Sequence, residues 1–349
     1  MSENSQPLRL LIVRLGAMGD ILHSLPAVTA LRQAHPEWTI GWAIEPQWRG
    51  LFAANGSEPR TPEMPLVDHL HMVPAKRWAK APLSTATWHD IGRVRRELRD
   101  LRYDLAVDMQ GAVRSAMIAR WARTGRVVGE DQPREFAAKW LFRERVPTSG
   151  VHVIEQSLEV ANAIAGENLP VTLPLLPRDA EADAHAVVLP QPFVLLSPGA
   201  GWGAKRWPAD RYGEVARRMA QAGYSVVVNS GPAEEHLARE IADNSAGAAT
   251  VLPLDMAGLI AVTRRAALAI AGDTGPLHLA CALGKPVVGI YGPTDPARNG
   301  PFHCASRVLR HPESVRDHTR RREPEAGLLT ITAADVTEAA LDLLREVRA

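Results

Sequence analysis

"LRLLIVRLGAMGDILHSLPAVTALRQA", residues 8–34, decides the fold class that the sequence predicts. The apolar run at 8–13 suits a buried strand, and residues 27–34 have the pattern of a helix. Two glycines between them let the backbone approach a bound group closely, and Asp20 follows where the helix begins. Pro26 predicts a kink or a fresh start in that helix. The order of strand, glycine-rich turn and helix indicates a parallel sheet covered by helices.

The same alternation of strand and helix continues along the chain. Its 349 residues exceed one ordinary core, so we expect two domains. The proline-rich stretch 166–192 holds the boundary, which gives domains at 1–175 and 190–349. The predicted fold class is α/β: two Rossmann-like domains with a central cleft, and a C-terminal helix at 332–347. The further predicted strands lie at 38–45, 69–73, 103–109, 192–199, 224–231, 249–254, 267–272 and 286–292.

Composition excludes several classes of protein. An apolar content of 46% and a charged content of 23% are those of a soluble globular protein. No run approaches the roughly 20 apolar residues of a membrane span, and the N-terminus lacks the anatomy of a signal peptide, so we expect a cytoplasmic protein. Cys281 and Cys304 form no CxxC pair, and we expect both to be reduced thiols. No metal-ligand cluster is apparent, so we expect neither a metal nor a cofactor.

The cationic residues gather in the first half. Residues 76–145 hold 16 Lys and Arg against 9 Asp and Glu, although the whole chain has a net charge of only +1. This asymmetry indicates an anionic partner, and a solvated helical face is the alternative. The basic cluster AKRWAK contains Trp78, whose ring we expect to pack on a sugar or lipid surface.

Three loops that follow predicted strands carry candidate chemistry. Asp20 is either a carboxylate of the first helical turn or a general base. In the second loop, SPGAGWGAKRWP, four small residues precede Lys205 and a helix start at Pro208, which is typical of a phosphate site; a plain turn is the alternative. In the third loop, GDTGPLH, Asp273 either caps a helix or orients sugar hydroxyls, and His278 is either structural or a donor to phosphate.

These segments resemble glycosyltransferase family 9, the bacterial ADP-heptose:lipopolysaccharide heptosyltransferases. The likeness covers nearly the whole chain and is strongest in MGDILHSLPA, DMQGAVRSA, SPGAGWGAKRWP, PAKRWAK and GDTGPLHLACALGKPVVGIYGPTDP. It implies the GT-B fold, with the acceptor on the first domain and the nucleotide sugar on the second. It also implies metal-independent transfer with inversion at the anomeric carbon.

The resemblance assigns roles to single residues. Asp20 matches the catalytic base, Lys205 a contact of the donor phosphate, and Asp273 the carboxylate on the heptose. Gly199 and Ala200 stand where the family often has hydroxyl residues, so backbone N–H groups are expected to replace them. The implied donor set is Lys205, Asp273, Thr274, Gly275, His278, Gly199, Ala200, Leu254 near adenine, and Glu234 or Glu235 on ribose; the implied acceptor set is Lys76, Arg77, Lys80, Arg114 and Arg134.

The leading interpretation is transfer of heptose from ADP-L-glycero-D-manno-heptose to the inner ketodeoxyoctonate of lipopolysaccharide, as in heptosyltransferase I. It implies a ketodeoxyoctonate–lipid A acceptor, peripheral contact with the cytoplasmic face of the inner membrane, and no nucleic-acid partner. Two alternatives are open: another transfer of this family, such as that of heptosyltransferase II or a protein heptosyltransferase, and a nucleotide-sugar-binding protein without turnover. The presence of Asp20 and Lys205 argues against the last.

Overall fold

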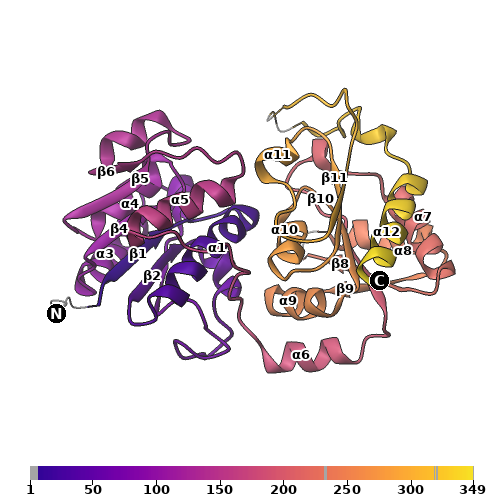
Figure 1. Ribbon diagram of the computed structural model, residues 1–349, viewed down its shortest axis with the longest axis horizontal. Helices are drawn as coiled ribbons and strands as arrows, with labels where there is room; N and C mark the ends of the chain where they lie inside the picture. The colour runs from indigo at the N-terminus through magenta and orange to yellow at the C-terminus, as the bar shows by residue number, and fades with distance from the viewer. Residues whose placement is uncertain (1–6, 232–233, 318, 320, 349) are drawn as a thin grey trace. The chain divides into compact units, whose positions relative to one another are not determined.

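The chain folds into two compact units in the computed structural model, which describes residues 7–231, 234–317, 319 and 321–348. The division falls between Arg178 and Asp179, inside the stretch where the sequence places the boundary. Each unit is a parallel six-stranded sheet with helices (Figure 1). Two Rossmann-like α/β units are therefore confirmed, whereas a cleft between them stays a prediction.

The sheet of the first unit has the strand order β3-β2-β1-β4-β5-β6. Its central strands are continuous apolar runs because helices cover both faces of a parallel sheet. All four of the residues that follow Arg9 in β1 are buried. The strands are β1 (Arg9–Val13), β2 (Thr39–Ile44), β3 (His69–Met72), β4 (Leu105–Asp108), β5 (Arg126–Glu130) and β6 (Glu144–Val146).

Two helical layers enclose this sheet. On one face α1 (Met18–Ala34) packs against α5 (Val153–Ala165), and on the other α3 (Thr85–Asp100) packs against α4 (Val113–Trp121). Leu11 and Val13 of the central strand contribute to the core beneath α3 and α4. The remaining helical segments are α2 (Ala75–Lys80), η1 (Pro46–Leu51) and η2 (Phe136–Leu141).

The second unit repeats the same strand order, as β12-β11-β10-β7-β8-β9. One core lies under α7, α8 and α12, and another under α6, α9 and α10. The strands are β7 (Phe193–Ser197), β8 (Ser225–Ser230), β9 (Ala249–Pro253), β10 (Leu268–Gly272), β11 (Val287–Tyr291) and β12 (Ser306–Arg310). The helices are α6 (Ala180–Val187), α7 (Ala209–Gln221), α8 (Glu235–Asn244), α9 (Met256–Arg265), α10 (Gly275–Ala282), α11 (Pro296–Asn299) and α12 (Ala333–Arg348), with η3 (Gly203–Lys205) and η4 (Leu328–Thr330).

Two features of the structure differ from the elements that the sequence predicts. Helix α1 runs through Pro26 as one helix of 17 residues, so the proline marks no fresh start. Strands β5, β6 and β12 were not among the predicted strands, since each lies at or next to a sheet edge and mixes charged with apolar residues. Among the described residues, none of the helices combines the length and apolar composition that crossing a membrane requires.

Candidate functional site

The loops after β1 and β4 are joined at the carboxyl edge of the first sheet. The guanidinium of Arg14 donates to the Met109 carbonyl oxygen. The N–H of Leu15 donates to Oε1 of Gln110 at 2.9 Å. Arg14 also pairs with Asp20, with 3.3 Å between Nη2 and Oδ1. These contacts hold the Asp20 carboxylate at the edge where ligands bind in open α/β sheets.

Asp20 occupies the third position of α1. Its Oδ2 accepts a hydrogen bond from the N–H of Ala17 at 3.1 Å, which is one half of a capping box. The side chain is nevertheless 44% exposed, so a substrate hydroxyl can reach it. The capping role is confirmed by this contact, and the role of general base stays a prediction.

Asp108 organises the loop that follows β4. The carboxyl group is fully buried and accepts hydrogen bonds from the N–H of Gln110 at 2.8 Å, the N–H of Gly111 at 3.2 Å and the hydroxyl of Ser115 at 2.9 Å. Burial raises the pKa of Asp108 to about 7, and these hydrogen bonds offset part of the effect. Asp108 therefore fixes the loop from which Gln110 reaches the β1 turn.

Replacing Asp108 with Asn should make the first unit more stable than wild type above pH 7. An acid whose pKa is raised on folding binds more protons in the native state than in the unfolded state. Its contribution to the free energy of unfolding therefore falls as the pH rises from the pKa of the unfolded state toward about 7. Raising the pKa of this carboxyl from 3.8 to about 7 destabilises the native state by roughly 4 kcal/mol at most. Asn keeps the acceptor for both backbone N–H groups and can donate to Ser115.

The measurement is urea unfolding of both proteins at pH 5 and pH 8. The difference between Asp108→Asn and wild type should favour the variant more strongly at pH 8. A difference that does not change with pH would show that Asp108 titrates normally in the native state.

The predicted acceptor cations lie on three segments that follow strands of the first sheet. Lys76, Arg77 and Lys80 are on α2, just after β3, and all three side chains are exposed. Arg77 pairs with Asp90 on the neighbouring α3. The prediction for Trp78 was wrong: its ring is buried in the core beside Trp121, so it offers no surface to a sugar or lipid.

Arg114 and Arg134 belong to segments that are hydrogen-bonded to each other. The N–H of Glu135 donates to the Gly111 carbonyl oxygen at 2.8 Å, and Oε2 of Glu135 accepts from the N–H of Val113 at 2.8 Å. Arg114 is the second residue of α4, and both arginine side chains are exposed. The fold thus places these two predicted acceptor residues in one region.

In the second unit, Asp273 is the centre of a buried polar cluster. It lies just after β10 and is 4% exposed. Its Oδ2 pairs with the ammonium of Lys205, and its Oδ1 lies 3.0 Å from Nε2 of His278. The amide of Asn299 donates to Oδ1 at 3.3 Å. Three of the predicted donor residues, Lys205, Asp273 and His278, are therefore in direct contact.

This cluster keeps a carboxylate charged inside the protein. Burial raises the pKa of Asp273, but the hydrogen bond and charge of His278 and the ammonium of Lys205 outweigh it and hold the pKa well below its usual range. Lys205 also lies over the ring of Trp202, 4.7 Å from the centroid. A buried ion pair of this kind depends on both partners, because either charge alone is costly there.

Helix α10 begins beside the cluster. Thr274 is its N-cap, but the Thr274 hydroxyl donates to the Gly272 carbonyl oxygen at 3.2 Å instead of capping the first turn. Gly275 is the first helical residue and is half-buried. The N–H groups at this helix start, apart from Pro276, and the ammonium of Lys205 are hydrogen-bond donors of the kind that suits a phosphate group.

The other predicted donor residues follow neighbouring strands. The carboxylate of Glu234 lies against Gly199, where an added Cβ would be 2.1 Å from Oε2. Burial raises the pKa of Glu234. Glu235 instead pairs with Arg239 along the exposed side of α8 at 2.9 Å. This geometry favours Glu234 over Glu235 as the carboxylate at the strand edge. Ala200 is half-buried beside Gly199, and Leu254 is half-buried after β9.

The sequence patterns do not predict three residues at these sites. Arg14 stands inside the opening motif, directly after the strand, and that position was the available signal. Glu45 follows β2 and accepts a hydrogen bond from the N–H of Lys76 at 2.8 Å. Asn299 lies at the end of α11, and its contact with Asp273 arises only from the folded chain.

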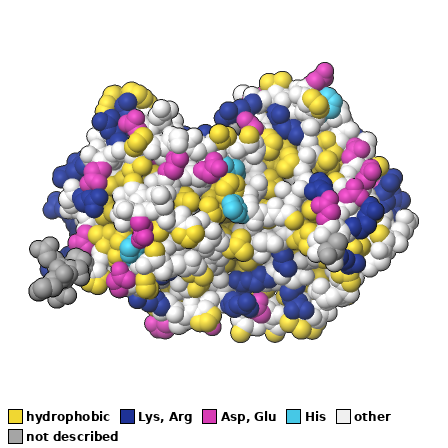
Figure 2. Space-filling model, in the orientation of Figure 1, with side chains coloured by type: hydrophobic (Ala, Val, Ile, Leu, Met, Phe, Trp, Pro, Cys, Tyr) yellow, Lys and Arg dark blue, Asp and Glu magenta, His cyan; other side chains and the backbone are white. Residues whose placement is uncertain are grey.

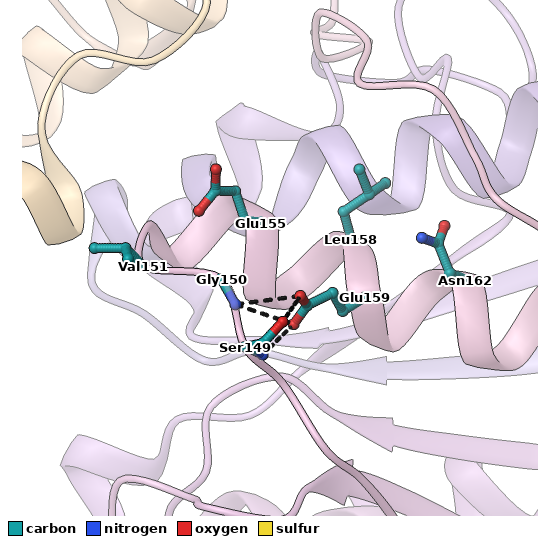
Figure 3. A pocket seen from close by; sticks show the side chains of 7 residues that line it. All are labelled: Ser149, Gly150, Val151, Glu155, Leu158, Glu159 and Asn162. Carbon is teal, nitrogen blue, oxygen red and sulfur yellow. Dashed lines mark hydrogen bonds between the residues drawn. The ribbon is translucent and has the colours of Figure 1, made fainter.

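A separate pocket lies at the start of α5 and contains none of the predicted site residues (Figure 3). Its charged lining residues are Glu155 and Glu159. Glu159 accepts hydrogen bonds from the N–H groups of Ser149 at 2.8 Å and Gly150 at 3.2 Å, as the dashed lines in Figure 3 show. An acidic lining whose carboxylates already bind backbone amides does not suit a phosphorylated ligand.

Comparison with known proteins identifies relatives along the whole chain. The model of a family described as glycosyltransferase family 9 (heptosyltransferase) matches residues 91–328. Lipopolysaccharide heptosyltransferase 1 of Pseudomonas aeruginosa PAO1 is 30% identical over 301 residues, which cover 84% of this chain and 81% of that protein. Lipopolysaccharide heptosyltransferase 1 of Escherichia coli K12 is 28% identical over 322 residues, covering 87% and 94%.

Solved structures of similar proteins cover both units. The E. coli heptosyltransferase WaaC with ADP has a TM-score of 0.79 and 26% identity, covering 96% of this chain and 100% of that chain. The same enzyme with ADP-2-deoxy-2-fluoro heptose has a TM-score of 0.78 and 27% identity, covering 96% and 99%. The predicted GT-B fold is confirmed by these similarities together with the two parallel sheets.

Proposed function

The chain belongs to glycosyltransferase family 9, and from that membership we propose that this glycosyltransferase moves a heptose from ADP-heptose to the inner ketodeoxyoctonate of lipopolysaccharide. The proposal assigns the donor to the second unit and the acceptor to the first. Relatives named lipopolysaccharide heptosyltransferase 1, and a structural neighbour that holds ADP, support this choice of donor and acceptor.

One observation carries the proposal: the cluster of Lys205, Asp273 and His278 at the start of α10. A diphosphate leaving group develops negative charge as the glycosidic bond to it breaks. The ammonium of Lys205 and the N–H groups of the first turn of α10 are positioned to neutralise that charge. Asp273, held ionised by its partners, is suited to accept hydrogen bonds from sugar hydroxyls.

On the acceptor side, Asp20 acts as the general base in this proposal. Its carboxylate takes the proton of the attacking hydroxyl while a bond forms between that oxygen and the anomeric carbon of the heptose. The bond from that carbon to the diphosphate oxygen breaks, ADP leaves, and the anomeric configuration inverts. Arg14 holds the carboxylate in place. The exposed cations Lys76, Arg77, Lys80, Arg114 and Arg134 bind the carboxylates and phosphates of the acceptor.

The test is mass spectrometry of the product formed from ADP-heptose and a ketodeoxyoctonate–lipid A acceptor. One added heptose on the acceptor is the expected result, and it should form equally well in the presence of a chelator. Acceptors that already carry one heptose, and a peptide acceptor, complete the panel. Transfer only to one of these would reject the proposed acceptor, and restoration by Mg²⁺ of activity lost to chelator would reject the proposed role of Lys205.

Replacing Lys76, Arg77 and Lys80 together with Ala should raise the acceptor KM at least about tenfold and leave the donor KM nearly unchanged, because charge-assisted contacts with the anionic acceptor are lost. The wild-type acceptor KM should also rise with salt, since exposed cations are screened beyond about 8 Å at physiological ionic strength.

Steady-state kinetics with each substrate varied separately measures both effects. The matched control replaces three exposed arginines of the second unit, Arg218, Arg239 and Arg345, with Ala. An equal rise in acceptor KM for this control, or a rise in donor KM for the α2 variant, would show that the α2 cluster is only a solvated surface.

A further inference from the structure

The segment 134–143 exposes two large aromatic rings at the surface of the first unit. Phe136 is 63% exposed and Trp140 is 71% exposed. The two rings contact each other edge to face with 5.7 Å between centroids. Figure 2 shows hydrophobic side chains beside Lys and Arg side chains over the segment that joins β5 and β6 in Figure 1. Rings left in water in this way mark an interaction surface.

The segment is well anchored although its rings are exposed. Ala138 is fully buried and Phe142 nearly so, and both contribute to the core of the first unit. Phe142 packs directly against Gly129 of β5, where an added Cβ would lie 2.4 Å from the ring. Arg120 of α4 donates to the Leu141 carbonyl oxygen at 3.2 Å. The backbone therefore holds Phe136 and Trp140 outward from a fixed base.

Cationic side chains outnumber acidic ones around the rings, because residues 120–145 hold seven Lys and Arg against four Asp and Glu. Lys139 places its ammonium 3.8 Å from the centroid of Phe136, and Arg134 and Arg143 have exposed side chains in the same segment. Two nearby carboxylates are paired with arginines: Glu144 with Arg126 at 2.8 Å and Asp131 with Arg145 at 3.7 Å. Glu135 accepts from the N–H of Val113 and keeps its charge at the surface. Aromatic rings beside an excess of cations are suited to the interface of an anionic bilayer, where rings lie at headgroup level and cations meet phosphates.

We propose that Phe136, Trp140 and Lys139 dock the protein on an anionic phospholipid surface. The inference rests on the proposed function in one respect: it explains why the protein docks, because a lipid-linked acceptor is presented at such a surface. Glu135, next to Phe136, is hydrogen-bonded to Gly111 and Val113, which precede Arg114 in the chain. Docking through the rings therefore brings Arg114 and Arg134 to the level of the headgroups, where the anionic sugars of the acceptor stand.

The experiment is co-sedimentation of the full chain with vesicles of phosphatidylethanolamine and phosphatidylglycerol. The variant Phe136→Ser with Trp140→Ser should bind at least about tenfold more weakly than wild type, since it loses both interfacial rings. Lys139→Glu should weaken binding to these vesicles but not to neutral phosphatidylcholine vesicles. The matched control is Leu83→Ser with Trp88→Ser, which removes two exposed apolar side chains elsewhere in the first unit.

Heptose transfer separates this inference from the proposed function. With a water-soluble, deacylated acceptor the Phe136 and Trp140 variant should keep wild-type kcat/KM, and with the acylated acceptor in vesicles it should lose about tenfold. Unchanged vesicle binding by this variant, or an equal loss in the Leu83 and Trp88 control, would overturn the docking surface. So would dimerisation of wild type through these rings. If wild type transfers no heptose but the Phe136 and Trp140 variant loses vesicle binding as expected, the docking surface is supported and the proposed function is rejected.

Discussion

Replacing Asp20 with Asn should lower kcat by about 10²-fold or more, the usual scale for removing a general base, while ADP binding stays close to wild type. Asn has the size of Asp and keeps an oxygen that can accept from the N–H of Ala17, so the start of α1 is retained. It cannot take a proton from a sugar hydroxyl. Single-turnover kinetics with saturating donor, and calorimetric titration with ADP, separate the two quantities.

The matched control is the same substitution at Asp335. Asp335 occupies the corresponding position at the start of α12 and accepts from the N–H of Thr332 at 2.8 Å, as Asp20 does from Ala17. Both carboxylates complete a helix N-terminus, but only Asp20 lies at a sheet edge beside Arg14. Asp335→Asn should therefore leave kcat unchanged. Near-normal turnover in Asp20→Asn would limit Asp20 to helix capping.

The central strands could be predicted because burial on both faces of a parallel sheet demands continuous apolar runs. Strand β1 is such a run, with all but its first residue buried. Strand β6 has only three residues, Glu144–Val146, none of them fully buried, so no hydrophobic pattern marks it. At a sheet edge, hydrogen bonds with a single neighbour define the strand, and these depend on partners far away in sequence.

Site residues could be predicted where a polar or charged side chain comes directly after a strand. Asp273 comes immediately after β10, so its position at the sheet edge follows from local sequence alone. The contact of Asn299 with Asp273 links residues that are 26 positions apart, and no local pattern reports it. The prediction for Trp78 was wrong for another reason. A basic–aromatic cluster does not indicate which side of a short helix faces the core, and in the six-residue α2 the ring of Trp78 faces inward.

Replacing Lys205 with Ala should have two large effects. Removing a well-placed electrostatic donor should cost about 3 kcal/mol of transition-state stabilisation, or roughly 10²-fold in kcat/KM. It should also destabilise the second unit by on the order of 3 kcal/mol, because Asp273 is left buried without its cationic partner. His278 and Asn299 still donate to Asp273, which keeps this cost at the lower end for a broken buried pair.

A double-mutant cycle with Asp273→Asn separates the two effects. Asp273→Asn alone leaves the buried ammonium of Lys205 without its counter-charge, so adding Lys205→Ala to it should cause no further loss in the free energy of unfolding and should recover part of what Asp273→Asn loses. If Lys205 neutralises the diphosphate, that same addition should still weaken ADP binding at least about tenfold, which calorimetric titration measures even where turnover is too slow to follow. If ADP binds equally well to Asp273→Asn and to the double variant, Lys205 serves only to balance Asp273. The charge of the leaving group would then have to be neutralised by the N–H groups at the start of α10 alone.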